Sequence, residues 1–453
     1  MMSILRGLTG LFCKNLKLVP LNPLFWYIIN TRGAFMTKLY SREKYLSRIR
    51  GFYHATDIIK VITGLRRCGK SSIMQLISRE LIKNGINKEN IIFISLQKRG
   101  FKSINTPEKL EEKIDKLSEG IKGTKYLFID EIQKVKGFEE VVDAYREESD
   151  YSIFITGSNS YLLSGELSTY LTGRYIEFEI CTLTFDEYIG MKDYFGLPVQ
   201  HNNLIQEFDK YIKEGGFPRA VLIDNLQDKQ TYVRGIIQEI FDKDIKKNKK
   251  IRNKELFNTI QTYIINNFGS KTSVGALCDY INKTRTEPIK KDTVYRYLGI
   301  LENAKIISRC NRFDMKSKKS INGEEKYFLG DLSFYFATNV DGRINYGPVL
   351  ENIVYNYAKS KRYQISVGQI GNLEVDFILR DQFDNYSYVQ VAMTIYSEEE
   401  DGIDKTQERE YRPLEQIEDN YPKYVLSLDY LMQKRGGIIH ENIVDFMSES
   451  KDF

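Results

Sequence analysis

The octapeptide Gly64–Ser71 restricts the fold of this 453-residue chain more than any other feature. It reads GLRRCGKS and fits the pattern GxxxxGK[ST] at every constrained position. It lies between a predicted strand, Ile58–Thr63, and a predicted helix, Ser71–Leu81. The glycines let the backbone curl so that its N–H groups point at a phosphate from a helix N-terminus. The pattern therefore predicts a phosphate-binding loop (P-loop) with these residues at the nucleotide: Gly64, Leu65, Arg66, Arg67, Cys68, Gly69, Lys70, Ser71 and Ser72.

Two side chains of this loop and two later acids predict the chemistry of the site. Lys70 is expected to contact the β- and γ-phosphates of ATP, and Ser71 to coordinate Mg²⁺. Further along, the apolar strand Tyr126–Ile129 ends in Asp130 and Glu131. Asp130 can hold the magnesium through water, and Glu131 can orient or deprotonate the attacking water. Together these residues predict an Mg²⁺-dependent ATP hydrolase.

The surrounding sequence predicts an α/β fold with a parallel sheet. Short, nearly continuous apolar runs alternate with amphipathic helical patterns between residues 50 and 190. Such runs are expected of strands that are covered on both faces. The predicted strands are Ile58–Thr63, Ile91–Leu96, Tyr126–Ile129 and Ser152–Thr156.

Several segments resemble one prokaryotic family of AAA-type ATPases. They are GLRRCGKSS, LFIDEIQ, ITGSNS and LTGRY, followed by LTFDEY and GGFP. The resemblance extends from about residue 40 to the C-terminus. It implies an AAA+ core, a winged-helix module and a C-terminal domain of uncharacterised function with a restriction-endonuclease-like core.

The resemblance also implies two further residues in the ATPase site. In AAA-type ATPases, a polar residue at the tip of the strand Ser152–Thr156 senses the γ-phosphate, which makes Thr156, Ser158 and Asn159 candidates. We expect Asn159 to act in catalysis, with an ordinary polar turn as the alternative. Arg174 can supply a cation to the transition state, in cis or from a neighbouring subunit of a homo-oligomer. An exposed structural arginine is the alternative there.

The order of predicted elements after residue 255 is that of a winged helix-turn-helix. Ser273 and Asp292 are expected to cap the second and third helices. Before them lies a basic segment, residues 243–254, with seven cations against two acids, Asp244 and the preceding Asp242, which predicts either a solvated linker or a binding segment. The elements are three helices and a hairpin: Leu256–Phe268, Ser273–Ile281, Asp292–Ala304, Ile306–Asp314 and Glu325–Leu329.

Cations near the third helix and in the hairpin turn favour DNA as a partner. A basic recognition helix and wing would suit a DNA groove and its phosphates. A winged helix used for protein contacts is the alternative, because the fold alone does not identify the partner. The cations are Lys290, Lys291, Arg296, Lys316, Lys318 and Lys319.

The C-terminal stretch departs from the nuclease pattern that its resemblance implies. PD-(D/E)xK nucleases place an Asp on one strand and (E/Q)xK on the next. Asp376 supplies the first acid, and Glu351 on the preceding helix can add a carboxylate. The next strand has Gln390 as a neutral ligand and Ala392 where the lysine is expected. Without that lysine, transition-state stabilisation should fall by several kcal/mol, so we predict a nuclease-like fold that has lost cleavage.

Bulk properties narrow the protein class. The formal net charge of +5 is mild for this length, and permits a nucleic-acid partner without requiring one. Five scattered cysteines and three distant histidines disfavour a zinc site or a His-based triad, and suit a reducing cytoplasm. No apolar run is long enough to span a bilayer. Residues 1–42 are basic and free of acids, which fits a targeting peptide or, as we favour, an upstream extension before a natural start at Met36.

These observations predict a division of the chain into an extension, an ATPase domain, a winged helix-turn-helix and a restriction-endonuclease-like domain. The leading hypothesis is an ATP-dependent switch or motor that acts on, or is regulated by, nucleic acid. The alternatives are a regulator that acts through protein–protein contacts and an active nuclease. The predicted boundaries are 1–45, 46–240, 241–335 and 336–453.

Overall fold

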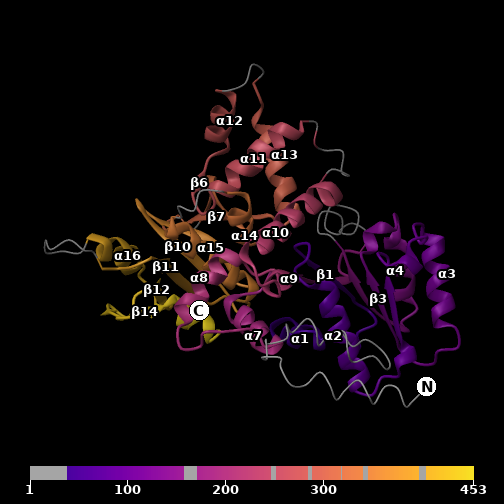
Figure 1. Ribbon diagram of the computed structural model, residues 1–453. Helices are drawn as coiled ribbons and strands as arrows, with labels where there is room; N and C mark the ends of the chain where they lie inside the picture. Colours follow the sequence, from indigo (N-terminus) through magenta and orange to yellow (C-terminus); the bar gives the residue numbers. More distant parts are fainter. Residues whose placement is uncertain are drawn as a thin grey trace, which may run out of the picture.

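The computed structural model describes residues 38–157, 171–245, 251, 253–283, 288–317, 319–339, 345–396 and 405–453 (Figure 1). A five-stranded sheet in the order β2-β3-β4-β1-β5 forms the first half of the molecule. All of its neighbouring strands are parallel. The strands are β1 (Ile59–Gly64), β2 (Ile91–Ser95), β3 (Lys125–Asp130), β4 (Tyr151–Thr156) and β5 (Tyr175–Ile180).

The four strands predicted from sequence are confirmed to within a residue at each end. β1 and β4 are buried along their whole length, as their continuous apolar character predicts. The prediction missed β5, which among the described strands is an edge strand paired with β1 alone. Its sequence YIEFEI alternates polar and apolar residues and is only partly buried, so it lacks the apolar run that marks the other strands.

Helices connect the strands and extend the domain. The helix after the P-loop spans two residues more at its C-terminal end than predicted. The helix α7 begins with a capping box, in which Thr184 and Glu187 satisfy each other's backbone N–H groups. The helices of this half are α1 (Glu43–Arg50), α2 (Lys70–Lys83), α3 (Pro107–Ser118), α4 (Phe138–Glu147), α7 (Phe185–Phe195), α8 (Leu204–Glu214), α9 (Pro218–Val221) and α10 (Leu226–Ile240), the last continued by a π-helical turn, Phe241–Ile245.

Three helices and a hairpin follow in the predicted order. Ser273 caps the second helix as expected, since its Oγ accepts from the N–H of Ala276 at 3.3 Å. The prediction that Asp292 caps the third helix is wrong. This helix starts one residue earlier, at Lys291, and Asp292 lies within its first turn. The elements are α11 (Lys254–Asn266), α12 (Val274–Asn282), α13 (Lys291–Asn303), β6 (Lys271–Thr272), β7 (Ile307–Asp314) and β8 (Lys319–Leu329).

A nine-stranded mixed sheet unites this hairpin with the C-terminal elements. Its order is β13-β14-β12-β11-β10-β9-β7-β8-β6, and β7 pairs in parallel with β9. The boundary predicted at residues 335/336 therefore falls between elements that share one sheet. The remaining elements are α14 (Ser333–Thr338), α15 (Tyr346–Ser360), β9 (Gln364–Ile370), β10 (Leu373–Arg380), β11 (Tyr386–Val391), α16 (Lys405–Glu415), β12 (Lys423–Ser427), β13 (Lys434–Arg435), β14 (Ile438–Asn442) and α17 (Ile443–Ser448).

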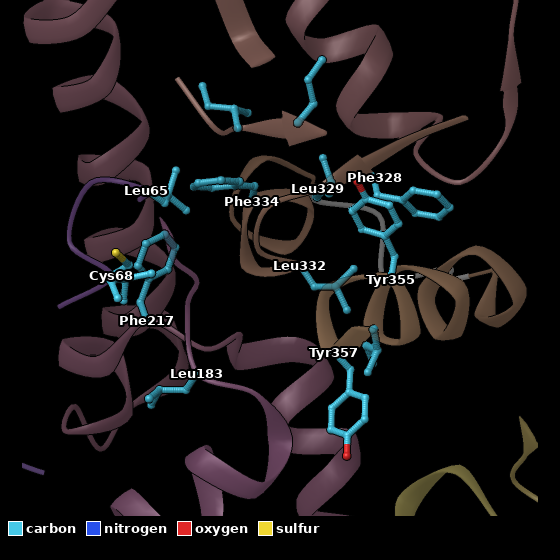
Figure 2. Close-up of a cluster of buried hydrophobic side chains, with 14 of the residues drawn as sticks. Leu65, Cys68, Leu183, Phe217, Phe328, Leu329, Leu332, Phe334, Tyr355 and Tyr357 are labelled. Atoms are coloured by element: carbon cyan, nitrogen blue, oxygen red, sulfur yellow. The ribbon is translucent and has the colours of Figure 1, made fainter. Parts of the chain in front are cut away.

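One apolar core joins the two halves. Buried side chains next to the P-loop belong to the same cluster as residues of the second sheet. Figure 2 shows Leu65 and Cys68 close to Phe217 and Phe334, and the rings of Phe217 and Phe334 lie 5.6 Å apart. A polar contact lies nearby, where the N–H of Gly216 donates to Asp331 at 2.9 Å. A Cβ at position 216 would meet the carbonyl oxygen of Leu183 at 2.2 Å, so this approach requires glycine.

Candidate nucleotide site

The P-loop of the structure has the shape that phosphate binding requires. Gly64 has φ +136°, and a Cβ there would meet the carbonyl oxygen of Ile180 at 2.2 Å, so no other residue fits. Gly69 has φ +109° and ends the loop at the start of α2. The Leu65 and Cys68 side chains are buried in the core. These two residues can therefore bind a nucleotide only through the backbone, whereas Ser71 and Ser72 border a cavity.

The ammonium group of Lys70 lies inside the loop. It donates to the carbonyl oxygens of Gly64 at 2.9 Å and Leu65 at 3.1 Å, and the side chain is largely buried. Among the described residues no carboxylate pairs with this buried cation, and a phosphate is a suitable counter-ion for such a group. The loop thus presents a charge and a curved backbone toward the same space.

Carboxylate and hydroxyl groups from three parallel strands and α2 meet at this edge of the sheet. Ser71 Oγ donates to Asp130 Oδ1 at 2.8 Å. Thr156 Oγ1 donates to the same oxygen at 2.7 Å, and Ser95 Oγ donates to Asp130 Oδ2 at 3.2 Å. The carboxyl ends of β2, β3 and β4 bring these residues together, as the parallel topology predicts. A hydroxyl and a carboxylate in contact are ligands of the kind that Mg²⁺ prefers.

Glu131 lies beside this group in a left-handed backbone conformation, with φ +62°. Its N–H donates to Thr156 Oγ1 at 3.1 Å, and its Oε2 accepts from Gln133 Nε2 at 2.6 Å. Thr156 therefore contacts both predicted acids. Of the polar residues predicted at this strand tip, Thr156 is in the site, whereas Ser158 and Asn159 lie outside the described residues.

Arg174 lies at the opposite end of the sheet. Its carbonyl oxygen accepts from the N–H of Ile59 at 2.9 Å, at the start of β1, whereas the P-loop follows the end of β1. A six-residue strand is about 20 Å long. The guanidinium pairs with Asp143 of α4 instead. The prediction that Arg174 contacts a nucleotide bound to its own chain is therefore wrong. The prediction that Arg174 contacts the nucleotide of a neighbouring subunit stays a prediction.

The cavity in front of the loop has a volume of about 830 Å³. This volume is within the range of pockets that enclose a small molecule. The apolar wall of the cavity, which includes two tyrosines, is suited to a nucleotide base. The opposite wall, formed by the P-loop, is suited to phosphates. The side chains of the apolar wall are Leu39, Tyr40, Leu76, Leu183, Met191, Phe195, Leu222 and Tyr232.

Two arginines at this cavity were missed from the sequence. Arg219 is exposed on α9 and borders the cavity directly after the GGFP segment. Arg42 is buried and forms a two-point ion pair with Glu187, at 2.9 and 2.6 Å, while its Nη1 donates to the carbonyl oxygen of Cys68 at 3.2 Å. Neither arginine belongs to a recognised pattern; only the proximity of Arg219 to GGFP was a usable signal.

The predicted nuclease residues meet around a lysine from another strand. Lys326 Nζ of β8 lies 2.7 Å from Glu351, 3.1 Å from Glu374 and 3.8 Å from Asp376. Burial, followed by the charge of Glu351, raises the pKa of Asp376 well above its usual range. Gln390 accepts from the N–H of Asp376 at 3.3 Å.

The ammonium of Lys326 supplies positive charge that the Ala392 position lacks. Its single charge balances part of the charge of Glu351, Glu374 and Asp376. Within the described ranges, no group of three or more His, Cys, Asp or Glu side chains is placed to hold a metal ion. The loss of cleavage stays a prediction.

The cations predicted to contact DNA are exposed where they are described. Lys290 and Lys291 lie at the start of α13, with Arg296 and the half-exposed Tyr295 one turn later. Lys316 lies at the hairpin turn. Lys318 and the side chain of Lys319 fall outside the described residues, as do five of the seven cations of the basic segment 243–254. Among the described helices, none combines the length and the apolar character needed to cross a bilayer.

Comparisons with known proteins agree with the P-loop geometry. Residues 56–189 match a family described as AAA domain, and residues 205–342 match a domain of unknown function (DUF8612). The Walker-type ATPase PABY2304 of Pyrococcus abyssi is 13% identical and superposes with a TM-score of 0.47, covering 66% of this chain and 95% of that chain. This likeness is too low for any inference.

Two relatives match most of the chain. An uncharacterised protein of Haemophilus influenzae is 32% identical over 408 residues, which is 90% of this chain and 98% of that protein. The uncharacterised protein MJ1544 of Methanocaldococcus jannaschii is 30% identical over 344 residues, or 74% of each chain. The chain has an AAA-type P-loop core, and it belongs to the family that includes these Haemophilus and Methanocaldococcus proteins.

Proposed function

We propose that this chain binds ATP with Mg²⁺ and hydrolyses it to drive a change in how the AAA core packs against the second sheet. The observation that supports this most is the contact of Ser71 with Asp130 at 2.8 Å, next to the buried ammonium of Lys70. Groups for the phosphates, the metal and the attacking water thus share one edge of the sheet. The cavity of about 830 Å³ leaves room for the nucleotide.

Each residue of the site has a separate role in the proposal. Ser71 and Asp130 would hold Mg²⁺, which when bound supplies charge neutralisation at the phosphates. Lys70 binds phosphate oxygens. Glu131 orients the attacking water or accepts a proton from it. Hydrogen bonds with Thr156 and Gln133 hold Glu131 in position.

The contact between the two halves offers a route for the response. The segment Gly215–Pro218 lies between the nucleotide cavity, which Pro218 and Arg219 border, and Asp331 of the second half. A movement of Arg219 on the bound nucleotide would be transmitted through Gly216 to Asp331. This contact supports a switch or motor rather than a simple nucleotide store.

The substitution Lys70→Ala tests the assignment of the loop. We expect ATP turnover to fall by about 10²–10³-fold, because a preorganised cation at the transferring phosphoryl group is lost. Phosphate release is the measurement. The matched control is Lys83→Ala at the exposed end of α2, which should retain turnover. Undiminished turnover in the Lys70→Ala protein would show that hydrolysis occurs elsewhere.

Nucleic acid is the partner that the exposed cations favour. Lys290, Lys291 and Arg296 project from one end of α13, with Tyr295 among them. A cluster of this kind suits phosphates and the face of a base. A protein partner is the alternative, since a winged helix can serve either purpose.

Fluorescence anisotropy separates these partners. We expect labelled duplex DNA to bind at low salt, and its affinity to fall steeply as salt rises. Replacing Lys290, Lys291 and Arg296 by Ala should reduce the affinity for DNA by at least about tenfold. The variant forms fewer phosphate contacts, so fewer counterions are released when it binds. In the control, Lys109, Lys113 and Lys116 of α3, on the other half of the molecule, are replaced by Ala, and the affinity for DNA should change less. Absence of binding at low salt would favour the protein partner.

A further inference from the structure

A second cleft lies between the AAA core and the C-terminal part of the chain. Its volume is about 600 Å³, and residues of α1, the start of α7, the end of α15 and the last few residues of the chain border it. A smaller cavity of about 190 Å³ shares three of its residues: Arg48, Ser360 and Arg362. The cleft volume is within the range of small-molecule pockets.

Most charges around this cleft are already paired within the protein. The acids there have cationic partners close by. The pairs are Arg42–Glu187, Lys44–Asp186, Arg50–Glu43 and Lys361–Asp452. Two more acids, Glu177 and Glu179, border the smaller cavity: Glu179 pairs with Lys305 and Lys359, and Glu177 accepts a hydrogen bond from Thr63 Oγ1. Among the described residues, none of the acids at the two cavities forms an ion pair with Arg48 or Arg362.

Arg48 and Arg362 are the exception. Within the described part of the chain, neither guanidinium has an ion-pair or hydrogen-bond partner, and Arg48 Nε is buried from solvent. The guanidinium carbon of Arg48 lies over the ring of Phe178, 5.9 Å from its centroid. Both arginines border the cleft and the smaller cavity. Burial lowers the pKa of Arg48, and the charge of Arg362 lowers it further. A buried donor without an acceptor, such as Arg48 Nε, is costly, and an anion at the cleft would supply the missing acceptor.

We propose that Arg48 and Arg362 bind a phosphate-bearing small molecule in this cleft. A guanidinium presents its N–H groups in a fork that matches phosphate oxygens, and two such groups balance a dianion. Lys44 and the hydroxyl of Ser360 lie at the same cleft, with Lys44 Nζ 3.3 Å from Ser360 Oγ. The cations come from both halves of the protein, so the ligand bridges them.

The site is adjacent to the nucleotide cavity and distinct from it. Tyr40 borders both. Glu187, at the second cleft, pairs with Arg42, which donates to the carbonyl oxygen of Cys68 in the P-loop. The proposal does not depend on hydrolysis of ATP at the first site, because it concerns only binding at the second.

Calorimetric titration with pyrophosphate tests the proposal. The full-length chain is used with Lys70→Ala, so that phosphate binding at the P-loop is weakened, and with EDTA to remove metal ions. We expect saturable binding that Arg48→Gln and Arg362→Gln each weaken by about tenfold or more, since a charged hydrogen bond is lost. Arg380→Gln, at a surface arginine bonded to Gln364, is the matched control and should leave the affinity unchanged.

Three results would overturn the proposal. One is the absence of saturable pyrophosphate binding, and another is unchanged affinity in both Gln variants. The third is equally tight binding of citrate, which has comparable charge but no phosphoryl group. Thermal unfolding establishes that each variant is folded. Arg362 is exposed, so the Arg362→Gln result stands even if Arg48→Gln proves unstable.

Discussion

Glu131 occupies a backbone conformation that side chains other than glycine rarely adopt. Its φ of +62° and ψ of +48° cost on the order of 1 kcal/mol or more. The hydrogen bonds to Thr156 and from Gln133 hold it there. The conformation places this carboxylate next to Asp130 at the edge of the sheet where β3 ends. Backbone strain of this kind is found at functional sites, which supports the proposed role for Glu131.

The substitution Glu131→Gln is expected to separate binding from hydrolysis. Glutamine keeps the shape and the bond to Gln133 but cannot accept the proton, so turnover should fall by about 10²–10⁴-fold. Affinity for a fluorescent ATP analogue should stay within about threefold of the parent, because Lys70 and the loop are intact. Glu140→Gln, at an exposed position of α4, is the control. Loss of nucleotide affinity would indicate that Glu131 supports the site rather than the reaction.

At the scale of elements, hydrogen bonds at helix ends and strand pairing at the sheet edge decide where helices begin and which strands form. The periodicity of apolar residues does not predict these features. The helix α12 begins where its cap residue predicts, whereas α13 begins before Asp292. Helix starts are set by hydrogen bonds of the first turn, and an acid inside that turn is favourable without being the cap. The strand β5 is recognised only by its pairing with β1.

Ser273→Ala should remove the cap of α12 and lower the free energy of unfolding by about 1 kcal/mol. The N–H of Ala276 then loses the oxygen that accepts its hydrogen bond. Urea denaturation followed by circular dichroism measures the change. Thr259→Ala on the exposed face of α11 is the control, because alanine favours the helix interior and leaves stability unchanged or slightly higher. Equal stability of parent and Ser273→Ala would mean that this bond contributes nothing.

At the scale of the whole molecule, ion pairs and apolar contacts join the AAA core to the second sheet. Glu179 on β5 binds Lys305 at 3.0 Å and Lys359 of α15 at 2.9 Å. Burial raises the pKa of Glu179, but the two lysines outweigh it and lower the pKa to about 2. The ring pair Phe217–Phe334 adds an apolar contact at the same junction.

This pKa predicts how stability depends on pH. The folded pKa of Glu179 is below its ordinary value, so its contribution is present above about pH 4.5 and is lost as pH falls toward 2. Glu179→Gln should lower stability at pH 7 by about 1–3 kcal/mol, and the difference from the parent should narrow in acid. Thermal unfolding across this range is the measurement. Glu441→Gln, at the peripheral pair with Lys451, should change stability by less than about 1 kcal/mol. A pH-independent difference would exclude the ion pairs as its cause.

The sequence by itself determined the P-loop, the four buried strands of the AAA core and the two acids at the end of β3, Asp130 and Glu131. Each depends on neighbouring residues: a glycine-rich turn between strand and helix, or an apolar run that must be buried. The contact of Ser71 with Asp130 also follows, because parallel strands end at one edge. The order of α11, α12, α13 and the hairpin is likewise determined by the local sequence of each element.

Only the tertiary structure decided which distant residues meet. Arg42 reaches the P-loop from before β1, Lys326 reaches Glu351 and Asp376 from a different strand, and Arg48 and Arg362 border one cleft from the two halves. The same holds for Arg174, whose place at the far end of the sheet depends on β5 lying beside β1. Long-range packing and strand order set these distances, and neither leaves a local pattern in the chain.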